Sequence, residues 1–156
     1  MSAIAAILRF HGDPVRDGEI ENLIEAMHAR GPHGSTVWRD GSIALAHSML
    51  HGTPQSFAEM QPLVAADRRY RLIWDGRRDN RDELRHELAL HRVVPRDETD
   101  PELVLQMYLL HGERAPERLL GDFAFAIWDS VEKQLFCARD QVGARPFYYV
   151  LTNKLF

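Results

Sequence analysis

The first half of the chain alternates between short apolar runs and one amphipathic segment. Residues 2–10 are almost continuously apolar and lead into Gly12-Asp13-Pro14, which predicts a strand that ends in a turn. From Glu19, apolar residues recur at spacings of three and four, which predicts a helix that stops before Gly31-Pro32. Further short strands are expected at residues 36–38, 43–47 and 71–75, with a loop at residues 53–60.

The second half predicts two helices followed by strands. Asn80, with Glu83 three residues later, resembles a capping box and predicts a helix start. Asp100-Pro101 predicts another helix, with Asp100 as N-cap and proline at the first helical position, ending near Gly112. Strands with apolar residues at both alternation phases, and therefore covered on both faces, are predicted at residues 122–129, 134–139 and 146–151.

The order of strands, then helices, then strands lacks the strict alternation of a doubly wound fold. It predicts an α+β fold with layered sheets. Residues 148–151, a turn at 152–154 and residues 155–156 have the pattern of a hairpin with a two-residue return strand. An exposed strand edge is unusual at a natural terminus, so this pattern favours the front piece of a longer protein, although short terminal strands also occur.

Size and charge narrow the class of protein. A chain of 156 residues predicts a single domain over 1–156. The formal net charge of −4 gives no uniform attraction to phosphate backbones, so a nucleic-acid partner is not expected. No apolar run is long enough for a membrane span, and the N-terminus lacks the features of a signal peptide. The single cysteine fits a reducing compartment, and we expect a cytoplasmic location without membrane contact.

Common catalytic motifs, including phosphate-binding loops, serine elbows and zinc motifs, are absent from the sequence. An ordered series of segments nevertheless resembles the N-terminal glutaminase domain of the asparagine synthetase family across nearly the whole chain. The series consists of Ile4-Ala5-Ala6-Ile7, Arg30-Gly31-Pro32-His33-Gly34, Gln61-Pro62-Leu63, Trp74-Asp75-Gly76 with Asn80-Arg81-Asp82-Glu83-Leu84, Thr99-Asp100-Pro101-Glu102, Gly121-Asp122-Phe123-Ala124-Phe125-Ala126-Ile127-Trp128-Asp129, and Ala138-Arg139-Asp140-Gln141-Val142-Gly143-Ala144-Arg145-Pro146-Phe147-Tyr148-Tyr149.

The resemblance implies an N-terminal-nucleophile hydrolase fold, a four-layer αββα sandwich of two stacked, mainly antiparallel sheets. It also implies a mechanism. In active members, removal of the initiator methionine exposes a cysteine whose own α-amino group activates the thiol. An asparagine side chain and a glycine N–H form the oxyanion hole, while an arginine and an aspartate hold the α-carboxylate and α-ammonium groups of glutamine.

The sequence departs from the family at two of these positions near its start. The family begins Met-Cys-Gly-Ile, whereas this chain has Ser2 at the nucleophile position, and a serine hydroxyl is far less ionised than a thiol. The family arginine in Gly-His-Arg-Arg-Leu corresponds to Met49. A thioether offers neither charge nor a fork of donors to a carboxylate.

The position of the oxyanion-hole asparagine also differs, although the oxyanion-hole glycine and the ammonium-binding aspartate both have matching residues. The family sequence Phe-Asn-Gly-Glu-Ile-Tyr-Asn corresponds to residues 74–80, so Asp75 replaces the asparagine while Gly76 matches the glycine. An ionised carboxylate would repel an oxyanion, and loss of one good donor costs about a hundredfold or more in rate. Asp100 matches the ammonium-binding aspartate, a residue type that also suits a helix cap. Glutamine hydrolysis is therefore expected to be lost.

Two hypotheses follow from the resemblance. In the first, this is a scaffold domain of an ATP-dependent amide-forming ligase, with a C-terminal synthetase domain as its partner. The parent would be a lasso-peptide macrolactam cyclase, with a precursor peptide and biosynthetic proteins as partners, or an asparagine synthetase relative using free ammonia. ATP and Mg²⁺ would belong to the synthetase domain, and no cofactor is expected here. In the second, Ser2 is the nucleophile of an active amidohydrolase whose substrate differs from ordinary glutamine.

Other chemically suggestive residues have simpler interpretations. His47 and His51 lie in a predicted strand and loop without a third ligand nearby in the sequence, which favours polar packing over a metal site. Cys137 lies within an apolar strand and is expected to be an inert buried thiol. Arg77-Arg78 is interleaved with acids, which predicts a solvated or ion-paired face, and Arg145 is expected to pair internally beside the last hairpin.

Overall fold

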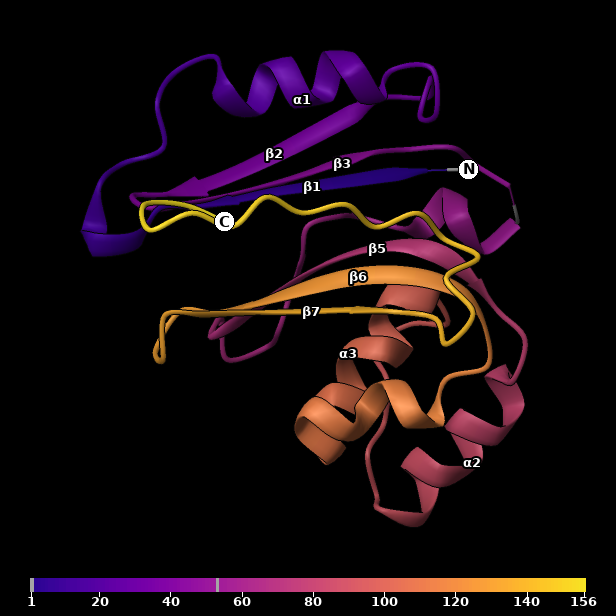
Figure 1. The fold of residues 1–156 in the computed structure, drawn as a ribbon. Helices are drawn as coiled ribbons and strands as arrows, with labels where there is room; N and C mark the ends of the chain where they lie inside the picture. The colour runs from indigo at the N-terminus through magenta and orange to yellow at the C-terminus, as the bar shows by residue number, and fades with distance from the viewer. Residues whose placement is uncertain (1, 53) are drawn as a thin grey trace.

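The computed structural model describes residues 2–52 and 54–156. In these residues, two antiparallel sheets lie face to face (Figure 1). One has the strand order β1-β3-β2 and comprises β1 (Ala3–Leu8), β2 (Ser35–Asp40) and β3 (Ile43–Ser48). The other has the order β4-β5-β6-β7 and comprises β4 (Leu63–Val64), β5 (Tyr70–Arg78), β6 (Gly121–Asp129) and β7 (Gln134–Arg139).

Helices cover the outer face of each sheet and complete the predicted αββα sandwich (Figure 1). They are α1 (Glu19–Met27) on the first sheet, and α2 (Arg81–Leu90) and α3 (Asp100–His111) on the second. Helix α1 forms where the period of three to four predicted it, because Ile20 is buried against Ala44 and Ala46 of β3. The predicted loop contains a 3-10 helix, Pro54–Ala58, and Thr53 lies outside the described residues. None of the described helices is long and apolar enough to cross a membrane.

The starts of α2 and α3 correct two sequence predictions. Thr99 is the N-cap of α3, with its hydroxyl accepting from the Glu102 N–H at 3.4 Å, and Asp100 is already helical. The side chain of Asn80 makes no cap bond, because it accepts from Leu120 N and donates to Arg118 O. The helices begin as predicted, but the expected caps have other partners.

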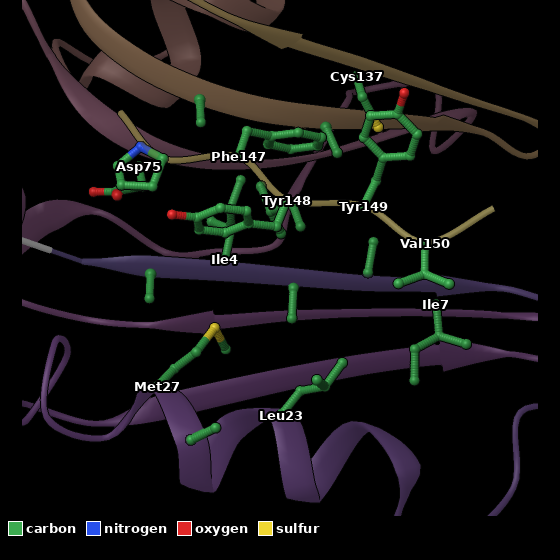
Figure 2. Close-up of a pocket in the computed structure, with 18 of the residues that line it drawn as sticks. Ile4, Ile7, Leu23, Met27, Asp75, Cys137, Phe147, Tyr148, Tyr149 and Val150 are labelled. Atoms are coloured by element: carbon green, nitrogen blue, oxygen red, sulfur yellow. The ribbon is translucent and has the colours of Figure 1, made fainter. Parts of the chain in front are cut away.

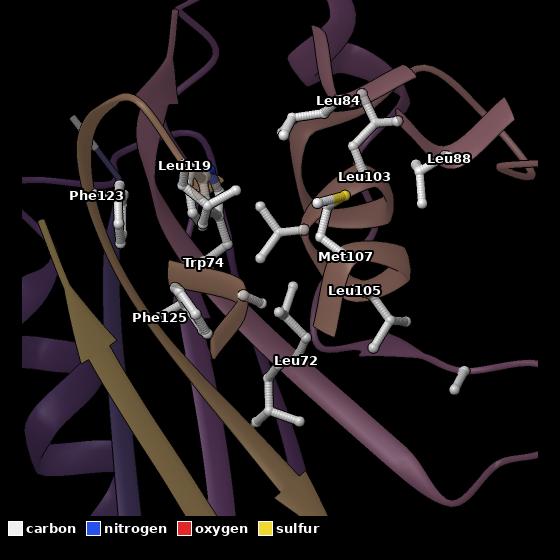
Figure 3. Close-up of a cluster of buried hydrophobic side chains, with 14 residues drawn as sticks. Leu72, Trp74, Leu84, Leu88, Leu103, Leu105, Met107, Leu119, Phe123 and Phe125 are labelled. Carbon is white, nitrogen blue, oxygen red and sulfur yellow. The ribbon is translucent and has the colours of Figure 1, made fainter. Parts of the chain in front are cut away.

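The core between the second sheet and its helices is large and aromatic (Figure 3). Trp74 of β5 stacks on Phe123 of β6 with ring centroids 5.6 Å apart, and Leu103 and Met107 of α3 are buried in the same cluster. Strand β6 is covered on both faces, as predicted, because Phe125 faces the helices while Ala126 faces the other sheet.

The C-terminal segment departs from the prediction. Residues 146–151 form no strand and run along the edges of the two sheets (Figure 1). The two-residue return exists, but Phe156 exchanges both backbone hydrogen bonds with Leu8 of β1, at 2.8 Å each, instead of pairing with residues 148–151. The segment therefore has no partner strand within the described residues, and β-prone residues form a strand only where a partner takes their backbone groups.

Candidate functional site

Ser2 immediately precedes β1 and is fixed by the end of β3. Its Oγ accepts a hydrogen bond from the Leu50 N–H at 3.0 Å and lies 3.5 Å from the Leu50 carbonyl oxygen. Antiparallel pairing of Ala3 with Ser48 brings these chain segments together. The hydroxyl at the predicted nucleophile position is therefore half-buried and already engaged with backbone groups.

Met49, at the predicted carboxylate-clamp position, is 9% exposed and belongs to the apolar interior. Its backbone N–H donates to Gly34 O at 2.7 Å, and its carbonyl accepts from His33 N at 3.0 Å. The loop that holds it packs tightly, since a Cβ on Gly31 would lie 2.3 Å from the Ser48 carbonyl carbon. Met49 thus supplies shape but no charge at this position.

Asp75 lies on β5 between two arginines, and it is 6% exposed. Its Oδ2 is 3.6 Å from Arg30 Nη2, and its Oδ1 is 4.0 Å from Arg145 Nη1. Burial raises the pKa of Asp75 above its ordinary value, and the charges of Arg145 and Arg30 partly oppose this shift. The predicted oxyanion position is therefore a carboxylate enclosed by two guanidinium groups.

The sequence alone gave no sign that Arg30 and Arg145 lie beside Asp75. Arg30 precedes the Gly31-Pro32 turn, and only its place in the Arg30–Gly34 motif could have drawn attention to it. Arg145 is close to Asp140, but only its backbone N–H donates to that carboxylate, at 2.9 Å. The Arg145 guanidinium instead approaches Asp75 and the Asp122 carbonyl oxygen, the latter at 3.5 Å from Nε.

Asp100, at the predicted ammonium-binding position, is also held by two arginines. Arg78 Nη2 donates to Asp100 Oδ1 at 2.8 Å, and Arg81 contacts the same oxygen. The Arg78 side chain is fully buried, so the prediction of an ion-paired face is confirmed, but in the interior rather than at the surface. Burial and the nearby Asp100 charge raise the pKa of Glu59 to about 7.

The structure brings only some of the predicted site residues together. Ala3, next to Ser2, and Asp75 line one groove between the sheets (Figure 2). Side chains alternate between the faces of a strand, and Trp74 faces the helices, so Arg78 projects to the helix side of β5 and Asp75 to the opposite side. The carboxylates of Asp75 and Asp100 therefore belong to separate charge clusters.

Gly76 matches its predicted position for a steric reason. A Cβ there would lie 2.7 Å from the Asp122 carbonyl oxygen and 2.7 Å from Trp74 Cζ2. Strands β5 and β6 pair Gly76 with Phe123, whose Cβ would be 2.8 Å away. Only glycine fits this close approach of the two strands.

The histidines and the cysteine lie in packed surroundings. Burial, with the nearby His51, lowers the pKa of His47 to about 4, and His51 stacks on Phe57 with centroids 4.4 Å apart. No group of three metal-binding side chains occurs among the residues that the structure describes. Burial raises the pKa of the Cys137 thiol to about 12, which agrees with the predicted inert thiol.

Two stacked antiparallel sheets between helical layers, with the predicted nucleophile at the start of the first strand, define the class of N-terminal-nucleophile hydrolase folds. Glutamine phosphoribosylpyrophosphate amidotransferase from Bacillus subtilis, solved with ADP and GMP, has this fold. It superposes with a TM-score of 0.54 at 18% identity, over 88% of this chain and 31% of that one.

The family model of the glutamine amidotransferase domain matches residues 1–156, and the chain belongs to this family. It is 30% identical to asparagine synthetase [glutamine-hydrolyzing] 3 of B. subtilis over 88% of its length, and 38% identical to asparagine synthetase 1 of the same organism over 85%. A putative asparagine synthetase 2 of Methanocaldococcus jannaschii is 29% identical over 96% of the chain. The chain spans 22%, 22% and 32% of these relatives, respectively.

Proposed function

We propose that this domain is a degenerate glutaminase that serves as a scaffold in an ATP-dependent amide-forming ligase of the asparagine synthetase family. The observation that carries the proposal is the enclosure of Asp75 by Arg30 and Arg145. An oxyanion hole needs donors aimed at the developing negative charge. Here the side chain at that position is a carboxylate, and the nearest guanidinium groups face it.

The size of this defect is sufficient to abolish useful turnover. Loss of one oxyanion donor lowers kcat by about 10²–10³, and an ionised carboxylate adds repulsion to that loss. Ser2 compounds it, because its hydroxyl is a weaker nucleophile than a thiolate and is bonded to Leu50.

Recognition of free glutamine is weakened as well. Met49 offers no charge to an α-carboxylate, and Arg78 and Arg81 neutralise Asp100, which would otherwise attract an α-ammonium group. A zwitterionic amino acid therefore meets no uncompensated charge at either position. A ligase that takes its amine from a peptide or from free ammonia has no need of either contact.

A second candidate function is an active amidohydrolase with Ser2 as nucleophile. The raised pKa of Asp75 favours it, since a protonated carboxyl group donates a hydrogen bond and so stabilises an oxyanion. This function requires removal of Met1, which lies outside the described residues, and a substrate with an apolar group beside Met49. Its activity would fall as the pH rises through the pKa of Asp75.

The test combines intact mass with ammonia release. The purified chain is incubated with a diazoketone analogue of glutamine and, separately, with glutamine at pH 5 to 8, beside a glutamine-hydrolysing family member as positive control. We expect no adduct and no ammonia above the Ser2→Ala background. An adduct that maps to Ser2 and disappears in Ser2→Ala would overturn the scaffold proposal in favour of the hydrolase.

The parent protein provides an independent test. A synthetase domain would bind ATP and Mg²⁺ and activate a carboxylate, for a macrolactam in lasso-peptide biosynthesis or for asparagine. Ser2→Ala in that protein should leave amide formation within about twofold of the wild-type rate. A loss of several orders of magnitude in a folded variant would show that the amine comes from this domain.

A further inference from the structure

A second, smaller cavity of about 330 Å³ lies at the end of β1 that is farthest from Ser2. Leu8 at the end of β1 and Phe10 just after it line one side. Trp128 of β6 and Lys133 of the β6–β7 turn line the other. These segments lie at the same end of the two-sheet sandwich (Figure 1). The cavity therefore sits between the two sheets at the end opposite the candidate site.

The indole N–H of Trp128 has no acceptor. Trp128 is 1% exposed, and its buried Nε1 atom makes no hydrogen bond within residues 2–52 and 54–156. A tryptophan N–H can only donate, and nearly all buried donors have a partner. A group that occupies the cavity beside this side chain is therefore expected to supply an acceptor.

Lys133 adds a free positive charge beside the same ring. Its Nζ lies 5.9 Å from the centroid of the Trp128 ring. In the part of the chain that the structure describes, Lys133 has no ion pair, whereas Arg9, which also lines the cavity, is paired with Glu19. The cavity thus offers one neutral donor and one uncompensated ammonium group.

Two of the residues that line the cavity have a left-handed backbone. Lys133 has a φ of 54° and His11 a φ of 65°, and they are two of the four described non-glycine residues with positive φ. Glycine adopts this conformation at lower cost than lysine or histidine. Residues in such sparsely populated conformations cluster at ligand sites. The conformation of Lys133 therefore favours a role for its side chain.

We propose that this cavity binds a small organic monocarboxylate with an apolar body, whose carboxylate accepts from Trp128 Nε1 and pairs with Lys133. A single negative charge matches the one free ammonium group, and an ionised acceptor makes a stronger hydrogen bond than a neutral one. The apolar body would lie against Leu8 and Phe10. The ligand would thereby connect the first sheet with the second.

The volume of the cavity limits the size of the ligand. At about 30 Å³ for each water molecule, the cavity has room for about eleven waters, and so for a ligand of about eleven non-hydrogen atoms. A ligand of this size with two polar contacts should bind with a Kd of the order of 1 mM. Neither Ser2, Asp75 nor any of residues 146–156 lines the cavity, so the site is independent of the proposed scaffold function.

The test follows the indole N–H resonance of Trp128 by nuclear magnetic resonance in the purified chain, which has three tryptophans. The probe is hydrocinnamate. Hydrocinnamamide is the neutral control, and acetate is the control without an apolar body. We expect hydrocinnamate to shift the Trp128 resonance downfield until the site is saturated. Both controls should bind about tenfold more weakly or less, because each lacks one of the two kinds of contact.

Three variants test the ammonium group. Lys133→Met should weaken hydrocinnamate binding about tenfold, whereas Lys133→Arg, which keeps the charge, should stay within about threefold of wild type. Lys154→Met is the matched control, because Lys154 is the other lysine of the chain and its exposed side chain does not line the cavity. Its affinity should equal that of the wild type. Circular dichroism confirms that all three variants are folded.

Three results would overturn the proposal. One is a Trp128 resonance that does not move at about 20 times the expected Kd. Another is equal binding of hydrocinnamate and hydrocinnamamide, or unchanged affinity in Lys133→Met, because the charge would then play no part. The third is binding of acetyl-glycyl-phenylalanine at least tenfold more tightly than hydrocinnamate, which would assign the carboxylate to the C-terminus of a peptide. The glutaminase assay is unaffected by any of these results.

Discussion

Replacement of Arg78 by methionine is expected to destabilise the fold by about 3 kcal/mol. The Arg78 side chain is fully buried and donates to Asp100 at 2.8 Å. Removal of one member of a buried ion pair costs about 3–5 kcal/mol, because the remaining charge is left uncompensated. Arg81 still contacts Asp100 after the change, which places the expected value at the low end of that range.

Chemical unfolding followed by circular dichroism measures this free energy. In thermal unfolding, each kcal/mol lowers the melting temperature of a chain of this size by about 2–4 °C, so Arg78→Met should lower it by about 6–12 °C. Arg81→Met is the matched control. Its side chain is 24% exposed, so its loss should cost no more than about 1 kcal/mol. Combining Arg78→Met with Asp100→Asn should recover part of the stability, since no buried charge then remains unpaired. The reasoning is refuted if Arg78→Met costs less than about 1 kcal/mol, or less than Arg81→Met.

Three further predictions address the strands around the site. Gly76→Ala should cost about 1–3 kcal/mol in the same unfolding assay, because the new Cβ would lie 2.7 Å from a backbone oxygen; an unchanged midpoint would contradict this packing. The Arg69 hydrogen bond lowers the pKa of Asp129 from 3.8 to about 2, so the pair stabilises the fold above pH 4 and loses this effect as pH falls toward 2. Arg69→Met should therefore unfold at a higher pH in an acid titration, and an unchanged midpoint would show that the pair contributes nothing. Cys137, with its pKa raised to about 12, should react with iodoacetamide at pH 8 at least 100-fold more slowly than glutathione, and a comparable rate would mean that the thiol is accessible and ionised.

Local patterns predicted most of the helices and strands, because the spacing of apolar residues marks the face of each element that packs into the core. The apolar period from Glu19 predicted α1, whose buried Ile20 contacts β3. The two apolar phases of residues 122–129 predicted a strand covered on both sides. Residues 146–151 are also rich in aromatic and β-branched residues but form no strand, because composition indicates β propensity and says nothing about a partner strand. Thr99 and Asp100 are both good N-caps, and tertiary pairing of the carboxylate decided between them.

The candidate site was predictable only as a set of positions. Ser2, Met49 and Asp75 were located from ordered motifs, and the departures at these positions were visible in the sequence itself. Their surroundings were not visible, because Arg30 and Arg145 come from segments 45 and 70 residues away from Asp75 and meet it only in the folded chain. Side chains alternate between the two faces of β5, which places Arg78 on the same face as Trp74. That Arg78 pairs with Asp100 depends on how α3 packs against this face.

Under the proposed function, the carboxylate at the ammonium-binding position and the carboxylate at the oxyanion position both have internal counter-ions. Asp100 faces Arg78 and Arg81, and Asp75 faces Arg30 and Arg145. A charge that binds a zwitterion must stay uncompensated until the ligand arrives, which costs stability in the empty domain. Once hydrolysis no longer matters, an internal pair removes that cost and rigidifies the strand and helix that carry it. On the same proposal, the pairs of Asp100 with Arg78 and Arg81 join β5 to the starts of α2 and α3 and so stiffen a platform for a synthetase domain.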